Sequence, residues 1–163
     1  MKLVNQKHPK IVTKDKEGHA NGWLVPIFNV HDGVLDEAQY PRQVYLTVIA
    51  PGQIKGPHLH LKRWGLFTCI RGNAKIVVRT ENGYEEYLTG EDYEFATIQV
   101  PAGVPAALQN IGDGDAYMLN MPAPAWHIDD QDEHPVSFDD YAFSFKNVRK
   151  ILVFCNQQIM ASC

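Results

Sequence analysis

Two histidines that lie two residues apart, His58 and His60, are the residues whose types and spacing point most directly to chemistry. On a β-strand, residues i and i+2 share a face, so both imidazoles would project into one space while Leu59 and Leu61 face the other side. An imidazole can transfer protons near neutral pH or bind a metal ion. A plainer alternative is that the pair fills a polar interior and is satisfied by hydrogen bonds. Because both side chains face the same space, we favour a functional pair.

The elements that would position this pair are short strands. Strand-like runs alternate with turn sequences such as Pro51-Gly52 and Asn82-Gly83, and the latter is a specific hairpin signal. Many short strands at regular spacing predict a sandwich or a closed barrel. A segment rich in Pro and Asp, residues 122–135, is expected to be an ordered loop that wraps the barrel. The predicted strands span residues 23–30, 43–50, 66–70, 74–79, 84–88, 97–100, 106–109 and 116–121.

Composition narrows the class of protein. The chain has 163 residues, which fits one domain, and a net charge of −4, which argues against a general nucleic-acid binder. No apolar run is long enough to span a membrane, and the polar, lysine-rich first 19 residues do not resemble a secretory signal. The three cysteines, Cys69, Cys155 and Cys163, have unrelated spacings that are typical of free thiols in a reducing compartment. We therefore expect a cytoplasmic protein with neither nucleic-acid nor membrane partners.

Two segments resemble the conserved motifs of the cupins. The first cupin motif, G-x5-H-x-H-x3-4-E-x6-G, is similar to the segment from Gly52 to Gly72, and the second, G-x5-P-x-G-x2-H-x3-N, is similar to the segment that ends at Asn110. The resemblance implies an all-β cupin fold, which is a double-stranded β-helix or jelly-roll barrel. The matching positions are Gly52, His58, His60, Gly72, Pro101, Gly103 and Asn110.

The departures from these motifs concern the metal. Metal-binding cupins use two His, one Glu and a further His, but here the Glu position holds Gly65 and the last His position holds Ala106. Neither residue can bind a metal, and catalytic sites usually need three protein ligands. We therefore expect no metal and no other cofactor, and we interpret His58 and His60 as proton-transfer groups.

Among cupins without a metal, the chain resembles the RmlC-like dTDP-sugar enzymes, which are the dTDP-4-dehydrorhamnose 3,5-epimerases and the dTDP-4-keto-6-deoxyglucose 3,4-ketoisomerases. The run from Lys55 to His60 is similar to the R-G-x-H-A-H segment of the ketoisomerases, and the run from Arg42 to Tyr45 is similar to an Arg-x-x-Tyr stretch upstream of it. Residues 126–140 loosely resemble a segment that covers the substrate in the epimerases. The resemblance implies a metal-independent epimerase or isomerase that removes a proton next to the ketone of a 4-keto sugar nucleotide.

This chemistry needs a base, an acid and a group that stabilises the enolate. The resemblance implies His58 as the base, His60 as a second proton carrier or hydrogen-bond partner, and Tyr45 as the acid. Trp64 could stack on the nucleobase, and Asn110 is a further expected substrate-binding residue. Each of four residues also has a purely structural interpretation. Arg63 and Lys75 could be ordinary surface charges, Trp64 could be a core aromatic residue, and Tyr45 could pack on one face of its strand. The cations expected to bind the enolate or the diphosphate are Lys55, Arg63, Arg71 and Lys75.

Two departures leave other functions open. The epimerases have a catalytic lysine where this chain has Gly65 and Leu66, and their catalytic tyrosine falls in the stretch that here reads Pro122 to Trp126. The alternatives are a metal-dependent cupin with atypical ligands, and a cupin that binds a small molecule or carbohydrate without catalysis. We expect an N-terminal arm at residues 1–20, a barrel at 21–145, and a tail at 146–163 that packs on the barrel or on the partner in a homodimer.

Overall fold

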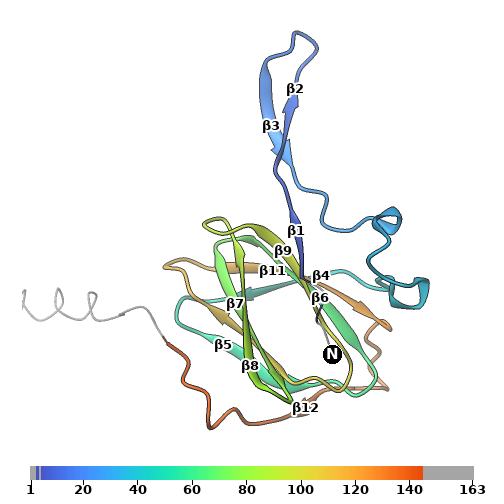
Figure 1. Cartoon of the computed structure of the whole chain (residues 1–163), viewed down its shortest axis with the longest axis vertical. Helices are drawn as coiled ribbons and strands as arrows, with labels where there is room; N and C mark the ends of the chain where they lie inside the picture. The colour runs from blue at the N-terminus through green and yellow to red at the C-terminus, as the bar shows by residue number, and fades with distance from the viewer. Residues whose placement is uncertain (1–2, 4, 145–163) are drawn as a thin grey trace, which may run out of the picture.

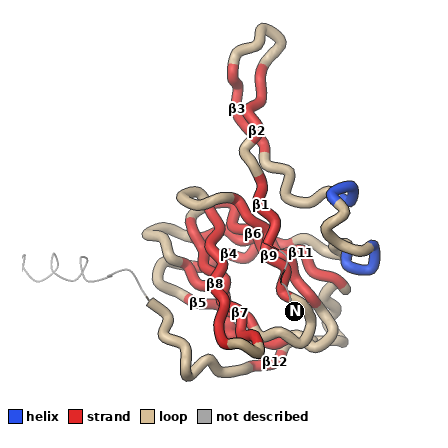
Figure 2. The backbone as a smooth tube through the Cα atoms, viewed as in Figure 1, coloured by secondary structure: helices blue, strands red, loops and turns tan. Residues whose placement is uncertain are grey.

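The computed structural model describes residue 3 and residues 5–144, and within them the chain is almost entirely β-structure (Figure 1). Two short 3-10 helices, η1 (Val30–Asp32) and η2 (Glu37–Gln39), lie in the long connection before β4 (Figure 2). The strands are β1 (Asn5–His8), β2 (Ile11–Lys14), β3 (Ala20–Leu24), β4 (Tyr45–Ile49), β5 (Ile54–Leu59), β6 (Trp64–Arg71), β7 (Asn73–Thr80), β8 (Gly83–Gly90), β9 (Phe95–Val100), β10 (Ala106–Asn110), β11 (Ala116–Ala123) and β12 (His134–Pro135).

The strands form two five-stranded antiparallel sheets, in the orders β1-β9-β6-β11-β4 and β12-β5-β10-β7-β8. The apolar core includes four large side chains that are at most 1% exposed: Ile49, Ile76, Ile98 and Met118. Each comes from a different strand, and burying such a side chain stabilises the fold by about 1.5–3 kcal/mol. The all-β jelly-roll barrel predicted from the sequence is confirmed.

Seven of the eight predicted strands have a counterpart, namely β4 and β6 to β11. The prediction for residues 23–30 was wrong beyond Leu24, where β3 ends. Pro26 supplies no backbone N–H to a sheet there, and Asn29 accepts a hydrogen bond from the backbone N of His31 at 3.0 Å, which starts η1 instead. The hairpin around Asn82-Gly83 is confirmed, with Thr80 paired to Gly83.

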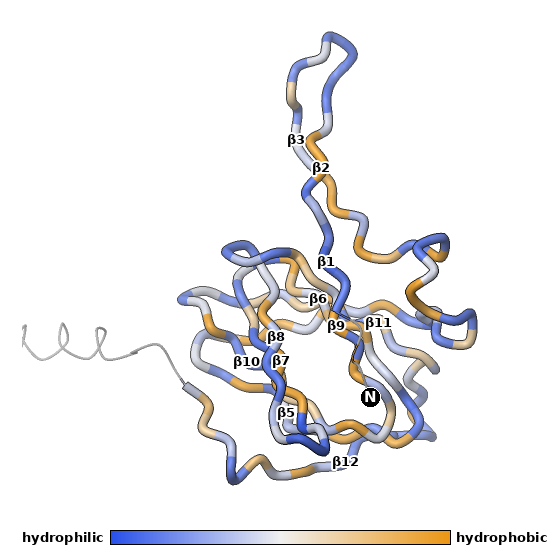
Figure 3. The backbone as a smooth tube through the Cα atoms, viewed as in Figure 1, coloured by the Kyte–Doolittle hydropathy of each residue, from blue (hydrophilic) through white to orange (hydrophobic). Residues whose placement is uncertain are grey.

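Sequence patterns missed four strands. The Gly56-Pro57 pair concealed β5, and β1, β2 and β12 have no strong alternation of apolar and polar residues. β1 pairs with β9, so residues 5–8 belong to a barrel sheet. β2 and β3 form a separate hairpin outside the barrel (Figures 1 and 3). The predicted tail at 146–163, with its apolar run at 151–155 and two of the cysteines, lies outside the described residues. Cys69 is a buried free thiol, and burial raises its pKa to about 11.

Candidate active site

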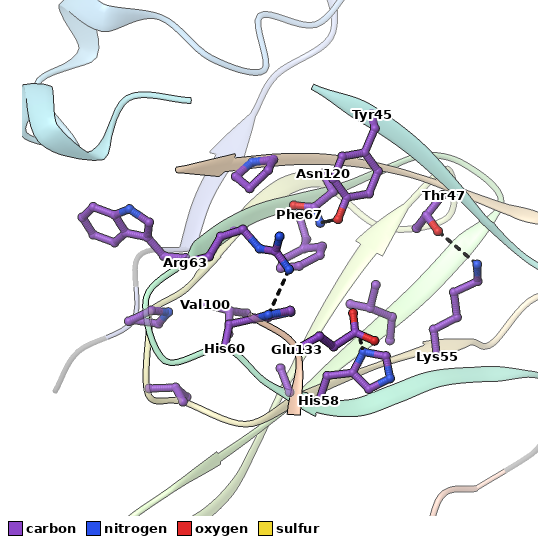
Figure 4. A pocket seen from close by; sticks show the side chains of 17 residues that line it. Tyr45, Thr47, Lys55, His58, His60, Arg63, Phe67, Val100, Asn120 and Glu133 are labelled. Atoms are coloured by element: carbon purple, nitrogen blue, oxygen red, sulfur yellow. Dashed lines mark hydrogen bonds and ion pairs between the residues drawn. The ribbon is translucent and has the colours of Figure 1, made fainter. Parts of the chain in front are cut away.

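A cavity of about 250 Å³ opens between the two sheets at one end of the barrel (Figure 4). One wall comes from β4, β6 and β11, and the other comes from β5 and β10. Six of the predicted site residues line it: Tyr45, Lys55, His58, His60, Arg63 and Trp64. The remaining lining residues are Thr47, Gly65, Phe67, Val100, Pro101, Val104, Ala106, Leu108, Asn120, Pro122 and Glu133.

A bulge in β5 brings Lys55 and His58 to the same wall. His58 pairs with Ala106 and Lys55 pairs with Leu108, so three residue steps on β5 oppose two on β10. In a regular strand, residues 55 and 58 would point to opposite faces. The extra residue requires Gly56, which has a φ of +86°, and a Cβ there would lie 2.9 Å from the backbone N of His58.

Three predicted substrate-binding residues, Arg71, Lys75 and Asn110, lie outside the cavity. Arg71 is exposed at the other end of β6, beside Tyr117. Lys75 donates to the hydroxyl of Tyr141 at 2.8 Å and pairs with Glu86 at 3.4 Å. Asn110 holds a turn, with its amide donating to the carbonyls of Ile49 at 2.7 Å and Gly114 at 2.8 Å. Each side chain has a structural contact elsewhere, so we leave all three out of the proposed site.

Glu133 is a cavity residue that the sequence patterns did not indicate. Its Oε2 lies 3.3 Å from Nδ1 of His58. The loop from β11 crosses to the edge of β5, where His134 pairs with Leu59 and Pro135 pairs with His58. This pairing places Glu133 beside the cavity, and the segment expected to be a loop begins and ends in strands, β11 and β12. The carboxylate can accept a hydrogen bond from the Nδ1–H group of His58, and this tautomer leaves a lone pair on Nε2.

Tyr45 and Asn120 lie on the wall opposite His58 (Figure 4). The Asn120 amide donates to the Tyr45 hydroxyl. Burial raises the pKa of Tyr45, although nearby Arg63 opposes this, so the phenol stays protonated at neutral pH. Asn120 is only 7% exposed, and its Oδ1 is buried without a hydrogen-bond partner among the described residues. A buried acceptor without a hydrogen-bond partner is costly for the fold.

Arg63 places a buried positive charge at the cavity. The residue is 8% exposed, and its Nη2 lies 3.0 Å from Nδ1 of His60. No carboxylate forms an ion pair with its guanidinium within residues 5–144. Burial lowers the pKa of His60 even though a main-chain contact with Asp132 opposes the shift, so His60 is neutral at pH 7. An uncompensated buried cation beside a cavity favours an anion or a developing negative charge there.

The cupin fold raises the question of a metal, and the residues at the cavity do not fit one. The two positions that would complete the ligand set hold Gly65 and Ala106. A Cβ on Gly65 would lie 2.6 Å from the Phe67 ring, so that space is already filled. The Arg63 guanidinium also places a positive charge 3.0 Å from Nδ1 of His60, which disfavours a second cation beside that ring. No group of three possible ligands occurs in the part of the chain that the structure describes.

This misfit leads to a prediction about metal content. Protein incubated with Zn²⁺, Mn²⁺ or Fe²⁺ and then desalted is expected to retain less than about a tenth of an equivalent, because two imidazoles are too few ligands. Elemental analysis measures the retained metal. A stoichiometric metal that is lost on His58→Asn substitution would contradict the prediction and favour the metal-dependent alternative.

Comparisons with solved structures place the fold. The chain is similar to a dTDP sugar isomerase from Desulfovibrio desulfuricans, with a TM-score of 0.69 and 14% identity over 84% of this chain and 85% of that chain. It is also similar to QdtA, a sugar 3,4-ketoisomerase from Thermoanaerobacterium thermosaccharolyticum solved with TDP, with a TM-score of 0.61 and 18% identity over 85% and 90%. A third likeness is to CapF, a capsular polysaccharide assembling protein from Staphylococcus aureus. The TM-score is 0.54 at 23% identity, and the matched region covers 60% of this chain but only 27% of CapF.

Together with the barrel and its motif positions, these likenesses show a cupin-type jelly-roll fold. The chain belongs to the family described as the polysaccharide biosynthesis C-terminal domain, whose model matches residues 34–134. A search of curated proteins found no match. Among the described residues, no helix is long and apolar enough to cross a membrane.

Proposed function

We propose that this chain is a metal-independent epimerase or isomerase that acts on a 4-keto sugar nucleotide of the dTDP-4-keto-6-deoxyhexose type. One observation carries the proposal: the His58–Glu133 pair faces the Tyr45–Asn120 pair across a cavity that also contains the buried charge of Arg63. Base, acid and anion stabiliser are the groups that proton transfer next to a ketone requires. The names of the similar dTDP-sugar isomerase and ketoisomerase support the substrate class.

In the proposed mechanism, Nε2 of His58 removes the proton from the carbon next to the ketone. Glu133 holds the proton on Nδ1 and stabilises the imidazolium that forms. The guanidinium of Arg63 stabilises the charge that develops on the enolate oxygen, and the protonated Tyr45 returns a proton from the opposite wall. His60 remains neutral and acts as a second proton carrier or as a hydrogen-bond partner of Arg63.

The rest of the cavity suits a sugar nucleotide. Lys55, whose Nζ donates to Thr47 at 3.1 Å, is the proposed diphosphate contact, and Trp64 is the proposed base-stacking residue. Phe67, Val100 and Leu108 supply apolar contacts for the sugar carbons. The side-chain amide of Asn120, which lines the cavity, would form a hydrogen bond with a sugar hydroxyl.

The test of this function is solvent exchange. Purified protein in D2O should introduce deuterium next to the ketone of a dTDP-4-keto-6-deoxy sugar, with Tyr45→Phe slower than wild type. A protein that is stabilised by the sugar nucleotide but never exchanges its protons would instead be a binding cupin without catalysis.

Asn120 provides a separate prediction about binding. Asn120→Ala is expected to raise the calorimetric Kd for dTDP-glucose by about fivefold to tenfold, because one hydrogen bond of roughly 1 kcal/mol is lost. The Kd for dTDP alone should not change, because Asn120 faces the sugar. Asn82→Ala, in an exposed turn, is the control and should alter neither value. An equal weakening of both ligands by Asn120→Ala would contradict this placement.

We also propose that the protein acts in the cytoplasm as a homodimer. The hairpin β2–β3 supports an association, because it extends away from the barrel and contains hydrophobic residues (Figure 3). An isolated two-stranded hairpin is marginally stable in water, and contact with a second copy would cover these side chains. They are Ile11, Val12, Trp23 and Leu24, which are between 46% and 60% exposed.

A further inference from the structure

Asp132 is a buried carboxylate that does not line the cavity yet contacts the turn that carries two of its residues. It is 6% exposed. Its Oδ1 accepts from the backbone N of Leu61 at 2.8 Å, and its Oδ2 accepts from the backbone N of Lys62 at 2.9 Å and of Arg63 at 2.8 Å. Three consecutive N–H groups that converge on one carboxylate form an anion-binding nest. Here the anion is a side chain of the protein itself.

The nest joins the two segments that make up the site. The turn that Asp132 caps begins directly after His60 and ends at Arg63, and the main-chain carbonyl of Asp132 contacts Nδ1 of His60. The next residue along the chain is Glu133, which reaches His58. Pairing of His134 and Pro135 with Leu59 and His58 holds the other side of Glu133. Glu133 is therefore held between two fixed points, and Asp132 is one of them.

We propose that Asp132 is a positioning residue that keeps the Glu133 carboxylate against His58. It acts through these residues and does not touch the ligand. The inference rests on the proposed function for its kinetic consequence, but the geometry that it predicts can be measured without turnover.

The charge of Asp132 is part of this arrangement. Burial alone would raise the pKa of Asp132, but the three backbone hydrogen bonds hold it below its usual value, so the group is ionised at neutral pH. The imidazole of His134 also faces it, at 3.7 Å from Oδ1. An Asn at this position keeps the size but only one acceptor oxygen, and its NH2 group would face N–H donors. The turn and Glu133 should then separate.

The first measurement is the tautomer of His58, read from the 15N shifts of its ring. In the wild type, Glu133 accepts from Nδ1, so the proton should reside on Nδ1. In Asp132→Asn, that preference should shift toward the Nε2-protonated form, as it should in Glu133→Gln. The matched control is Asp130→Asn on the same loop, which removes an exposed ion pair with Lys62 at 2.8 Å. In this variant the His58 tautomer should be the same as in the wild type.

The second measurement is the rate of solvent exchange. Asp132→Asn should lower kcat by about 10²-fold, because misplacement of a catalytic group by about 1 Å has that effect, while KM stays within about threefold. The double variant Asp132→Asn/Glu133→Gln should be no slower than Glu133→Gln within about twofold, since both changes remove the same contact. Asp132→Glu, which keeps the carboxylate, should recover part of both signals, and it provides a second test if Asp132→Asn unfolds.

Two results would overturn the positioning role. One is an unchanged His58 tautomer in folded Asp132→Asn. The other is a double variant whose loss is the product of the two single losses, which would mean that Asp132 acts independently of Glu133. If the wild type exchanges no proton in any sugar nucleotide, the proposed function fails, but the tautomer comparison still decides the role of Asp132.

Discussion

Replacing His58 with Asn is expected to slow exchange of the proton next to the ketone by roughly 10²–10⁴-fold, the usual contribution of a well-placed general base. His58 lies on the cavity wall, and Glu133 lies 3.3 Å from its Nδ1. Asn keeps a similar polar volume but cannot take up a proton at neutral pH. The fold should persist, because the His58 side chain is 40% exposed and contributes little to the core. Proton NMR in D2O measures the rate.

The matched control for this change is His31→Asn. His31 lies in the exposed η1 helix and does not line the cavity. The rate at which the His31→Asn variant exchanges the substrate proton should equal that of the wild type. If His58→Asn retained more than about a tenth of the wild-type rate, another residue would have to be the base, because general-base removal rarely has so small an effect.

Replacing Arg63 with Met is expected to lower kcat by about 10²–10³-fold, which is the typical loss when a donor to a developing oxyanion is removed. Met keeps much of the length and apolar surface of the Arg stem but has no charge. The guanidinium is buried without a carboxylate partner among the described residues, so the substitution does not leave an unpaired acid behind. Stability should therefore change little or increase, which thermal unfolding can measure.

Arg71→Met is the matched control for Arg63→Met. Both residues were expected from the sequence to bind substrate, but Arg71 is exposed and lies outside the cavity. Arg71→Met should leave kcat unchanged. Equal losses in the two variants would contradict the assignment of the enolate site to Arg63 and would favour a general effect of positive charge on association with an anionic ligand.

The sequence predicted the barrel and six of the residues that line the cavity, because these depend on local patterns. Turn residues at short intervals indicated β4 and β6 to β11, and the motif around His58 and His60 indicated where the pocket lies. Asn110 matched a motif and does have a defined role, but that role is to hold a turn through the carbonyls of Ile49 and Gly114. Motif matching located a structural position there and not a binding group.

The remaining features depend on contacts between distant segments. Glu133 reaches His58 only because β12 pairs with β5, and two residues of β12 give no alternation to detect. Lys55 and His58 share a wall because of a bulge whose position is set by pairing with β10. Lys75 has the charge expected of a residue that binds an anionic ligand, but its contacts with Tyr141 and Glu86 hold it outside the cavity. Local sequence patterns do not encode these pairings.

The proposed function requires that this chain transfers protons at the carbon next to a ketone without a metal. The most direct measurement is a time course of the proton NMR spectrum of a dTDP-4-keto-6-deoxy sugar in D2O, with protein stripped of metal by a chelator. We predict that the signal of the proton next to the ketone disappears with wild-type protein and persists with His58→Asn. An unchanged spectrum with folded wild-type protein, or exchange that returns only when a divalent metal is added, would contradict the account.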